Sequence, residues 1–118
     1  VYILTSKDTF SAAEGLAYFL QQHKLAEVIG EKTAGAANPI EHFIIQNEYL
    51  LFVPAGKVSS LVNHKNWEPM GVVPNQEVKA EDALKTAHIT ILKNSLTAET
   101  KTGLSLTEIK NLIQKLEE

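Results

Sequence analysis

TFSAAE at residues 9–14 joins a β-branched run at residues 1–5, VYILT, to an amphipathic segment that begins at residue 11. The run VYILT predicts a short buried strand, and residues 11–23 predict a helix. A second apolar run at residues 26–30, AEVIG, predicts another strand. This order predicts a βαβ unit, in which the two strands are parallel and the crossover is right-handed.

The predicted helix has an apolar stripe at helical spacing, which we expect to face the core. The stripe consists of Ala13, Leu16, Ala17 and Leu20, and it leaves Glu14 on another face. Gly15 lowers helix propensity and indicates close packing against a neighbouring backbone.

Ser11 has two interpretations. A serine between a strand and a helix has an exposed hydroxyl close to free backbone N–H groups, as a nucleophile that attacks a carbonyl requires. Ser11-x-x-Glu14 is also a capping box, in which each residue satisfies the other's backbone N–H. The same spacing recurs at Ser105-x-x-Glu108, where we expect no chemistry, so the spacing alone indicates no function.

The remaining chain predicts mixed α/β elements and a separate tail. Residues 33–39 form a loop of small residues, 42–46 and 49–54 predict a β-hairpin, and 71–75 predict a short extended piece that ends in a turn. Residues 81–96 predict a helix, 97–103 a polar linker, and the segment from residue 105 a last amphipathic helix. We therefore divide the chain into residues 1–96 and a linker plus C-terminal helix at 97–118.

Composition excludes several classes of protein. The 118 residues have a net charge of −3, eleven Lys, no Arg and no Cys. Without Arg, and with the Lys residues scattered, a nucleic-acid partner is not expected. The absence of Cys excludes disulfides and thiolate chemistry. No apolar run approaches the length of a membrane span. The chain opens in a strand-like run without a start methionine or signal peptide, so we expect a fragment of a longer protein.

Three blocks of the sequence resemble one family. LTS at 4–6 with TFSAAE at 9–14, VIGEKTAG at 28–35, and NWEPMGVVPN at 66–75 resemble, in order and spacing, blocks of the tail-specific, or carboxyl-terminal processing, serine proteases. The closer similarity is to their branch related to interphotoreceptor retinoid-binding protein and the tricorn protease. ALKTAH at 83–88 is similar to the helix that commonly follows, and the resemblance covers roughly residues 1 to 92.

This resemblance implies a fold and a reaction. The fold is part of an α/β crotonase/ClpP-like domain with a mixed sheet, βαβ units, a β-hairpin and C-terminal helices. Ser11 matches the nucleophile, and the N–H of Ala12 would be one oxyanion donor. In the family the second donor comes from a glycine upstream of the nucleophile, which this chain does not contain. Peptides or proteins are the implied substrates, and an extracytoplasmic location is suggested by the resemblance alone.

At the position of the general base, this sequence differs from part of the family. The processing proteases carry a lysine after the glycine of the small-residue loop, but here that position is Ala36, which excludes a Ser-Lys dyad there. Lys32 is close in sequence but on the wrong side of the motif. The tricorn-like branch uses an upstream histidine assisted by a downstream glutamate, and Glu68 lies in that glutamate's block. We therefore expect Glu68 to orient a base that lies upstream of this chain.

Other candidate residues have simpler interpretations. We expect His23, His42, His64 and His88 to be structural or surface residues, with His23 capping a helix C-terminus. No His pair has the i, i+4 spacing of a helical zinc site, so we expect neither metal nor cofactor. Trp67 is interpreted as a core residue rather than a substrate contact.

Two further hypotheses stay open. Since relatives of the retinoid-binding kind carry this fold, the chain could be a non-catalytic module that binds a lipophilic ligand such as a retinoid or fatty acid. The loss of lysine at Ala36 fits that hypothesis as well as it fits a changed base. Residues 97–118 could also be a separate interaction helix, because the apolar face of that helix needs a partner.

Overall fold

The structure is a computed structural model that describes residues 1–97 and 103–118. Most of the linker predicted at 97–103, namely residues 98–102, lies outside the described residues. The described elements are β1 (Tyr2–Thr5), α1 (Ala12–Gln22), β2 (Glu27–Gly30), β3 (Ile40–Ile45), β4 (Tyr49–Pro54), β5 (Gln76–Glu77), α2 (Ala80–Thr97) and α3 (Leu106–Glu117).

The predicted βαβ unit is present. β1 and β2 pair in parallel, with Leu4 opposite Ile29, and α1 connects them. β5 adds a third parallel strand beside β2, which gives the order β1-β2-β5. The paired residues of β5 follow directly after the extended piece predicted at 71–75. β3 and β4 form a separate antiparallel hairpin, as predicted, so parallel and antiparallel pairs occur in two sheets.

The parallel sheet is covered by a helix on each face. Successive side chains of a strand point to opposite faces. Val28 therefore packs with Ala17 and Tyr18 of α1, whereas Ile29 packs with Ala83 and Ala87 of α2. The result is an α/β arrangement with two small cores, one between α1 and the sheet and one between α2 and the sheet.

The buried face of α1 differs from the predicted stripe. Ala17 is buried as expected, but Ala13 and Leu16 are exposed, and the other buried residues are Glu14, Gly15 and Tyr18. Gly15 is buried because Trp67 lies against it: a Cβ built on Gly15 would be 3.2 Å from the Trp67 ring. The face of α1 that carries Glu14 and Gly15 is therefore the buried one, and it is directed toward Trp67 and toward the polar groups that bind Glu14.

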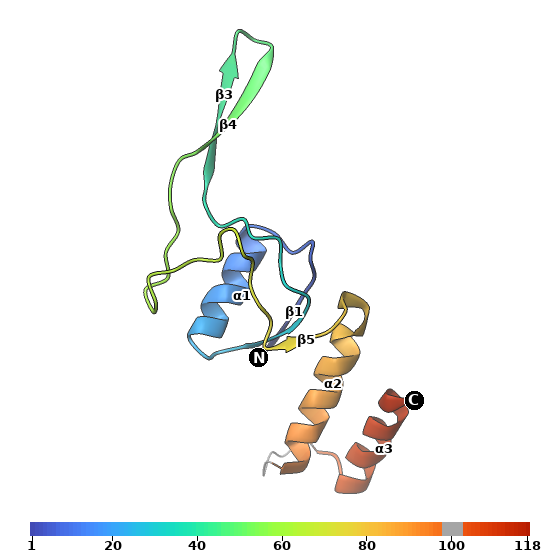
Figure 1. The fold of residues 1–118 in the computed structure, drawn as a ribbon. Helices are drawn as coiled ribbons and strands as arrows, with labels where there is room; N and C mark the ends of the chain where they lie inside the picture. Colours follow the sequence, from blue (N-terminus) through green and yellow to red (C-terminus); the bar gives the residue numbers. More distant parts are fainter. Residues whose placement is uncertain (98–102) are drawn as a thin grey trace.

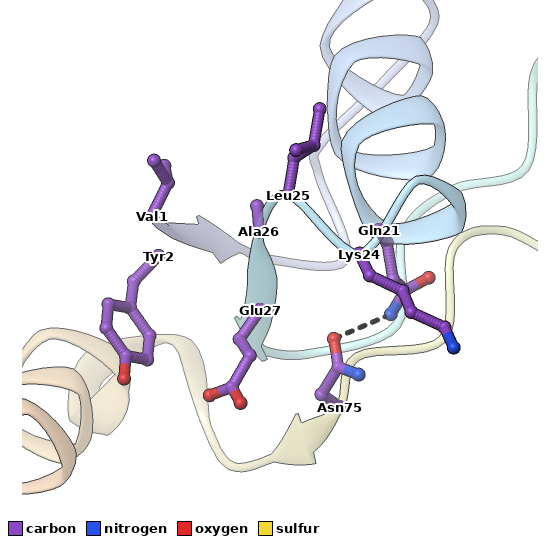
Figure 2. A pocket seen from close by; sticks show the side chains of 8 residues that line it. All are labelled: Val1, Tyr2, Gln21, Lys24, Leu25, Ala26, Glu27 and Asn75. Atoms are coloured by element: carbon purple, nitrogen blue, oxygen red, sulfur yellow. Dashed lines mark hydrogen bonds between the residues drawn. The ribbon is translucent and has the colours of Figure 1, made fainter. Parts of the chain in front are cut away.

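Asn75 fixes the C-terminal end of α1 to the sheet. Its side-chain Oδ1 accepts hydrogen bonds from the Val28 N–H at 2.8 Å and from the Gln21 amide at 2.9 Å. The second of these bonds is drawn in Figure 2, where Gln21 and Asn75 line a pocket of about 360 Å³ beside the start of β1 and β2. This pocket lies at the end of α1 opposite to Ser11.

The β3–β4 hairpin projects away from the body formed by the parallel sheet and its two covering helices (Figure 1). Every residue of both strands is exposed, although most are apolar, with Ile44 72% and Tyr49 64% exposed. The radius of gyration is 19.1 Å, whereas a compact domain of this length has a value of about 13–14 Å. The hairpin therefore carries an apolar surface that the described residues do not cover.

α2 and α3 lie side by side at the other end of the molecule (Figure 1). α2 buries Ala83 and Ala87 but leaves Leu84 and Ile91 exposed. Ser105 caps α3 by accepting a hydrogen bond from the Glu108 N–H, as its capping box predicted. α3 buries Ile109 and Ile113, and Lys93 of α2 forms an ion pair with Glu117 at 2.7 Å. Because α3 packs on α2, its apolar face finds part of its partner within the chain; the division at residue 97 stays a prediction.

We predict that Gly35→Ala destabilises the protein far more than Gly103→Ala. Both glycines have positive φ, +96° and +73°, which costs an L-residue about 1–3 kcal/mol. A Cβ on Gly35 would also lie 2.1 Å from the Pro69 carbonyl oxygen, whereas a Cβ on Gly103 meets nothing within 4 Å. Denaturant unfolding of both variants, followed by the fluorescence of the one tryptophan, Trp67, measures the difference. Equal losses for the two variants would contradict this packing of the loop.

Candidate active site

Ser11 sits on a sharp turn between β1 and α1. Residues 6–9 make the turn, closed by the Thr9 N–H donating to the Ser6 carbonyl at 3.0 Å. Ser11 then has φ 52° and ψ −117°, a strained combination for a residue with a side chain. Strained serines on strand-to-helix turns are typical of nucleophile elbows, where the turn exposes the hydroxyl.

The hydroxyl of Ser11 does not cap the helix. Both residue types of the capping box are in place, but the Ser11 side chain makes no cap hydrogen bond. Ser105, which has the same spacing, does make this bond. The two capping boxes therefore differ: Ser105 is a helix cap, whereas the exposed Ser11 keeps its hydroxyl available.

Ala12 supplies the first amide of α1. The first amides of a helix have no intrahelical acceptor, and the helix dipole places positive potential there. Among the described residues no backbone hydrogen bond uses the Ala12 N–H. This N–H follows Ser11 directly, in the position of the oxyanion donor that follows the serine of a nucleophile elbow.

Glu14 is the residue at this site whose role the sequence did not reveal. Its side chain is completely buried and accepts four hydrogen bonds. Oε1 accepts from Thr33 Oγ1 at 2.5 Å and from the Gly35 N–H at 2.6 Å. Oε2 accepts from the Ser11 N–H at 2.8 Å and from the Ala36 N–H at 2.9 Å. An ionised carboxylate has about four lone-pair sites, so these donors saturate it.

Burial and hydrogen bonding act in opposite directions on the pKa of Glu14. Burial alone raises the pKa of this carboxyl, because it disfavours the charge. The bonds from Thr33, Ala36, Gly35 and Ser11 favour the charge, and together they hold the pKa below the ordinary value of 4.5. Glu14 is therefore ionised at neutral pH.

A cleft of about 400 Å³ lies beside Ser11. Trp67 packs there with Tyr18 and Phe19, which confirms it as a core residue, and its buried Nε1 has no hydrogen-bond partner among the described residues. The residues that line the cleft come from the start of α1, the small-residue loop, the segment after β4 and the third sequence block, and most of them are apolar: Ser11, Ala12, Gly15, Leu16, Phe19, Ala37, Asn38, Pro39, Val58 and Trp67.

Glu68 binds the C-terminal part of the small-residue loop. Its Oε2 accepts hydrogen bonds from the Ala37 N–H at 2.8 Å and from the Asn38 N–H at 3.1 Å. Glu68 is exposed, and its Oε1 has no hydrogen-bond partner among the described residues. Since Ala37 and Asn38 line the cleft that Ser11 also lines, Glu68 is bonded to a wall of that cleft.

No histidine or lysine from residues 1–97 and 103–118 lines this cleft. The position expected for a lysine, Ala36, directs its N–H to Glu14. His23 is the C-cap residue of α1, as predicted, and His42 and His88 lie in β3 and α2. No group of three or more metal-ligating side chains occurs within residues 1–97 and 103–118. In the same part of the chain no helix is long and apolar enough to cross a membrane.

A sequence signal for Glu14 existed but was ambiguous. A carboxylate three residues after Ser11 fits a capping box, and the apolar stripe placed Glu14 outside the core. The stretch of small residues at 33–37 is the complementary signal, because it exposes consecutive N–H groups to a buried acceptor.

Comparisons with known proteins agree with this architecture. Among solved structures, the chain is similar to a photosystem II D1 C-terminal processing protease, with 22% identity and a TM-score of 0.58 over 68% of this chain and 20% of that one. It is also similar to mature CPAF, with 22% identity and a TM-score of 0.54 over 70% of this chain and 16% of that one. These likenesses show the fold, and the chain spans about a fifth or less of either neighbour.

The family match covers the part of the chain that contains the candidate site. The sequence model of peptidase family S41 matches residues 1–78, which include Ser11, Glu14 and Glu68. This is more than half of the 118 residues. The chain therefore belongs to peptidase family S41.

Proposed function

We propose that this chain supplies the nucleophile and one oxyanion donor of a serine peptidase. The observation that carries the proposal is Ser11, whose strained backbone and uncapped hydroxyl lie at the start of α1 and beside a cleft. The family supports peptides or proteins as substrates. The apolar lining of the cleft suits an apolar side chain next to the scissile bond.

The proposed reaction is acyl transfer. Ser11 Oγ attacks the carbonyl carbon of the scissile peptide while a general base takes the hydroxyl proton. The oxygen that becomes negative is stabilised by the Ala12 N–H and by the positive end of α1. The C–N bond then breaks, and the base returns the proton to the leaving amine. Water hydrolyses the resulting ester of Ser11 by the same steps.

We assign the general base and the second oxyanion donor to residues outside this chain. The Ala12 N–H is one donor, and no titratable nitrogen from the described residues lines the cleft. Glu68 has one carboxylate oxygen bonded to the cleft wall, which leaves Oε1 to accept a hydrogen bond from a base. We therefore assign Glu68 the role of orienting that base, as in the Ser-His-acid arrangement.

The exposed hairpin supports action within a larger domain. The apolar side chains of β3 and β4 are not covered by the described residues, and the chain spans 20% and 16% of the two solved neighbours. The whole protein's substrate and activity are part of this proposal.

We predict that a fluorophosphonate probe labels the full-length protein at Ser11 and that Ser11→Ala abolishes labelling. Ser105→Ala is the matched control, because Ser105 has the same Ser-x-x-Glu spacing but caps α3. Peptide mapping by mass spectrometry locates the adduct. Full labelling and unchanged peptide cleavage by the Ser11→Ala protein would sink the assignment. A parent protein that is not labelled and cleaves no peptide, but shows saturable retinoid or fatty-acid binding, would favour the alternative of a non-catalytic module for lipophilic ligands.

A second prediction concerns the chain by itself. The 118-residue protein should cleave no peptide, because the base and one oxyanion donor are supplied from elsewhere; one missing donor alone costs about 10²–10³ in rate. Turnover of a fluorogenic peptide library measures this. Cleavage by the chain alone that disappears in the Ser11→Ala variant would show that the base lies within these residues.

A further inference from the structure

Glu14 has no chemical step in the proposed reaction, yet it is the most completely satisfied side chain of the site. All four of its acceptor positions are occupied, and none of the partners carries a charge. A buried carboxylate that is bound only by neutral donors is held in one orientation by them. The positions of the four donors therefore determine the position and orientation of the Glu14 carboxylate.

The four donors come from two separate segments of the chain. Ser11 belongs to the turn before α1, whereas Thr33, Gly35 and Ala36 belong to the loop after β2. The two carboxylate oxygens have different partners. Oε2 accepts one hydrogen bond from each segment, whereas Oε1 accepts two hydrogen bonds from the loop. Glu14 thus joins the backbone of the candidate nucleophile to the loop.

The strained backbone of Ser11 depends on its hydrogen bond to Glu14. A strained φ/ψ pair persists only when the surrounding structure holds it. The Ser11 N–H is held by the Glu14 carboxylate at 2.8 Å, one residue before the candidate oxyanion donor Ala12. Glu14 consequently fixes the torsion that presents the Ser11 hydroxyl.

The same carboxylate fixes one wall of the cleft. The N–H groups of Gly35 and Ala36 go to Glu14, and those of the next two residues, Ala37 and Asn38, go to Glu68. Ala37 and Asn38 line the cleft together with Ser11 and residues of α1. The distance between Ser11 and this wall is therefore set through Glu14.

We propose that Glu14 is a positioning residue, which holds the Ser11 elbow and the loop at 33–36 in one fixed relation so that the hydroxyl meets a substrate bound in the cleft. This inference rests on the proposed function of Ser11. It assigns Glu14 no contact with substrate, and it predicts an effect on kcat rather than on substrate affinity.

The charge of Glu14 should make this link sensitive to acid. Its pKa is lowered in the folded protein, so the carboxylate stabilises the fold above pH 4.5, and the contribution is lost as the pH falls through the lower folded value. Thermal unfolding of the parent and of Glu14→Gln between pH 7 and pH 3 tests this. The difference in unfolding temperature between the parent and Glu14→Gln should become smaller below pH 4.5. A difference that stays constant with pH would contradict an ionised Glu14.

The direct test compares Glu14→Gln with Glu108→Gln in the full-length protein. Gln places an NH₂ group where the carboxylate accepts from two donors, so it cannot satisfy all four. Misplacement by about 1 Å can cost about 10²-fold in rate, and we expect kcat to fall by that factor with KM nearly unchanged. Glu108 makes the same capping bond to the Ser105 N–H, at 2.8 Å and far from the cleft, so Glu108→Gln should keep the parent kcat.

Thr33 offers a milder pair of variants in case Glu14→Gln does not fold. Thr33→Val removes one donor to Glu14 and should lower kcat about tenfold, whereas Thr33→Ser keeps the hydroxyl and should restore it. Hydrogen exchange gives a readout that needs no catalysis. The Ser11, Gly35 and Ala36 amides should lose protection together in Glu14→Gln and keep it in Glu108→Gln.

The outcomes separate this inference from the proposed function. A folded Glu14→Gln protein with a lower melting temperature but the parent kcat would make Glu14 merely structural and overturn the inference. Protection lost at Gly35 and Ala36 but retained at Ser11 would overturn it as well. If the parent itself is not labelled at Ser11, the proposed function fails, and hydrogen exchange alone decides whether Glu14 joins the two segments.

Discussion

The structure of the site depends on one buried carboxylate. Glu14 accepts hydrogen bonds from the turn that carries Ser11 and from the loop that follows β2. A buried charge is unfavourable unless its hydrogen-bonding capacity is filled, and here four neutral donors fill it. The sequence must therefore provide a loop with free, closely spaced N–H groups, which explains the small residues around Gly35.

This network also joins the three sequence blocks that resemble the family. Glu14 lies in the first block and binds Thr33 of the second, whose Oγ1 also accepts a hydrogen bond from the Val72 N–H of the third at 2.7 Å. Glu68 of the third block returns to the loop by binding the Ala37 N–H. Blocks far apart in the sequence thus meet at one place, because each one completes the hydrogen bonding of another.

The fold was predictable from the sequence where local patterns are strong. The βαβ unit, the hairpin around residues 47–48 and the capped helix after Ser105 all follow from apolar periodicity, turn residues and capping. The buried face of α1 was predicted wrongly. Apolar spacing favoured Ala13 and Leu16, but the burial of Glu14 and the contact of Gly15 with Trp67 depend on segments that meet only in three dimensions.

The candidate site was predictable only in part. The positions of Ser11 and Ala12 at the strand-to-helix turn follow from the pattern, but the strained torsion of Ser11 does not, because nothing local in the sequence requires it. The bonds of Glu68 to the loop likewise depend on the close approach of residues about 30 positions apart. The apolar hairpin shows the same limit: its pattern predicts strands, but not what covers them.

The most direct test is a crystal structure of the full-length protein after reaction with a fluorophosphonate. We expect a phosphorus–oxygen bond to Ser11 Oγ, with a phosphonyl oxygen about 2.7–3.1 Å from the Ala12 N–H. We also expect Glu14 still to bind the Ser11, Gly35 and Ala36 amides. An adduct on another residue, or a phosphonyl oxygen directed away from the start of α1, would contradict the role proposed for Ser11.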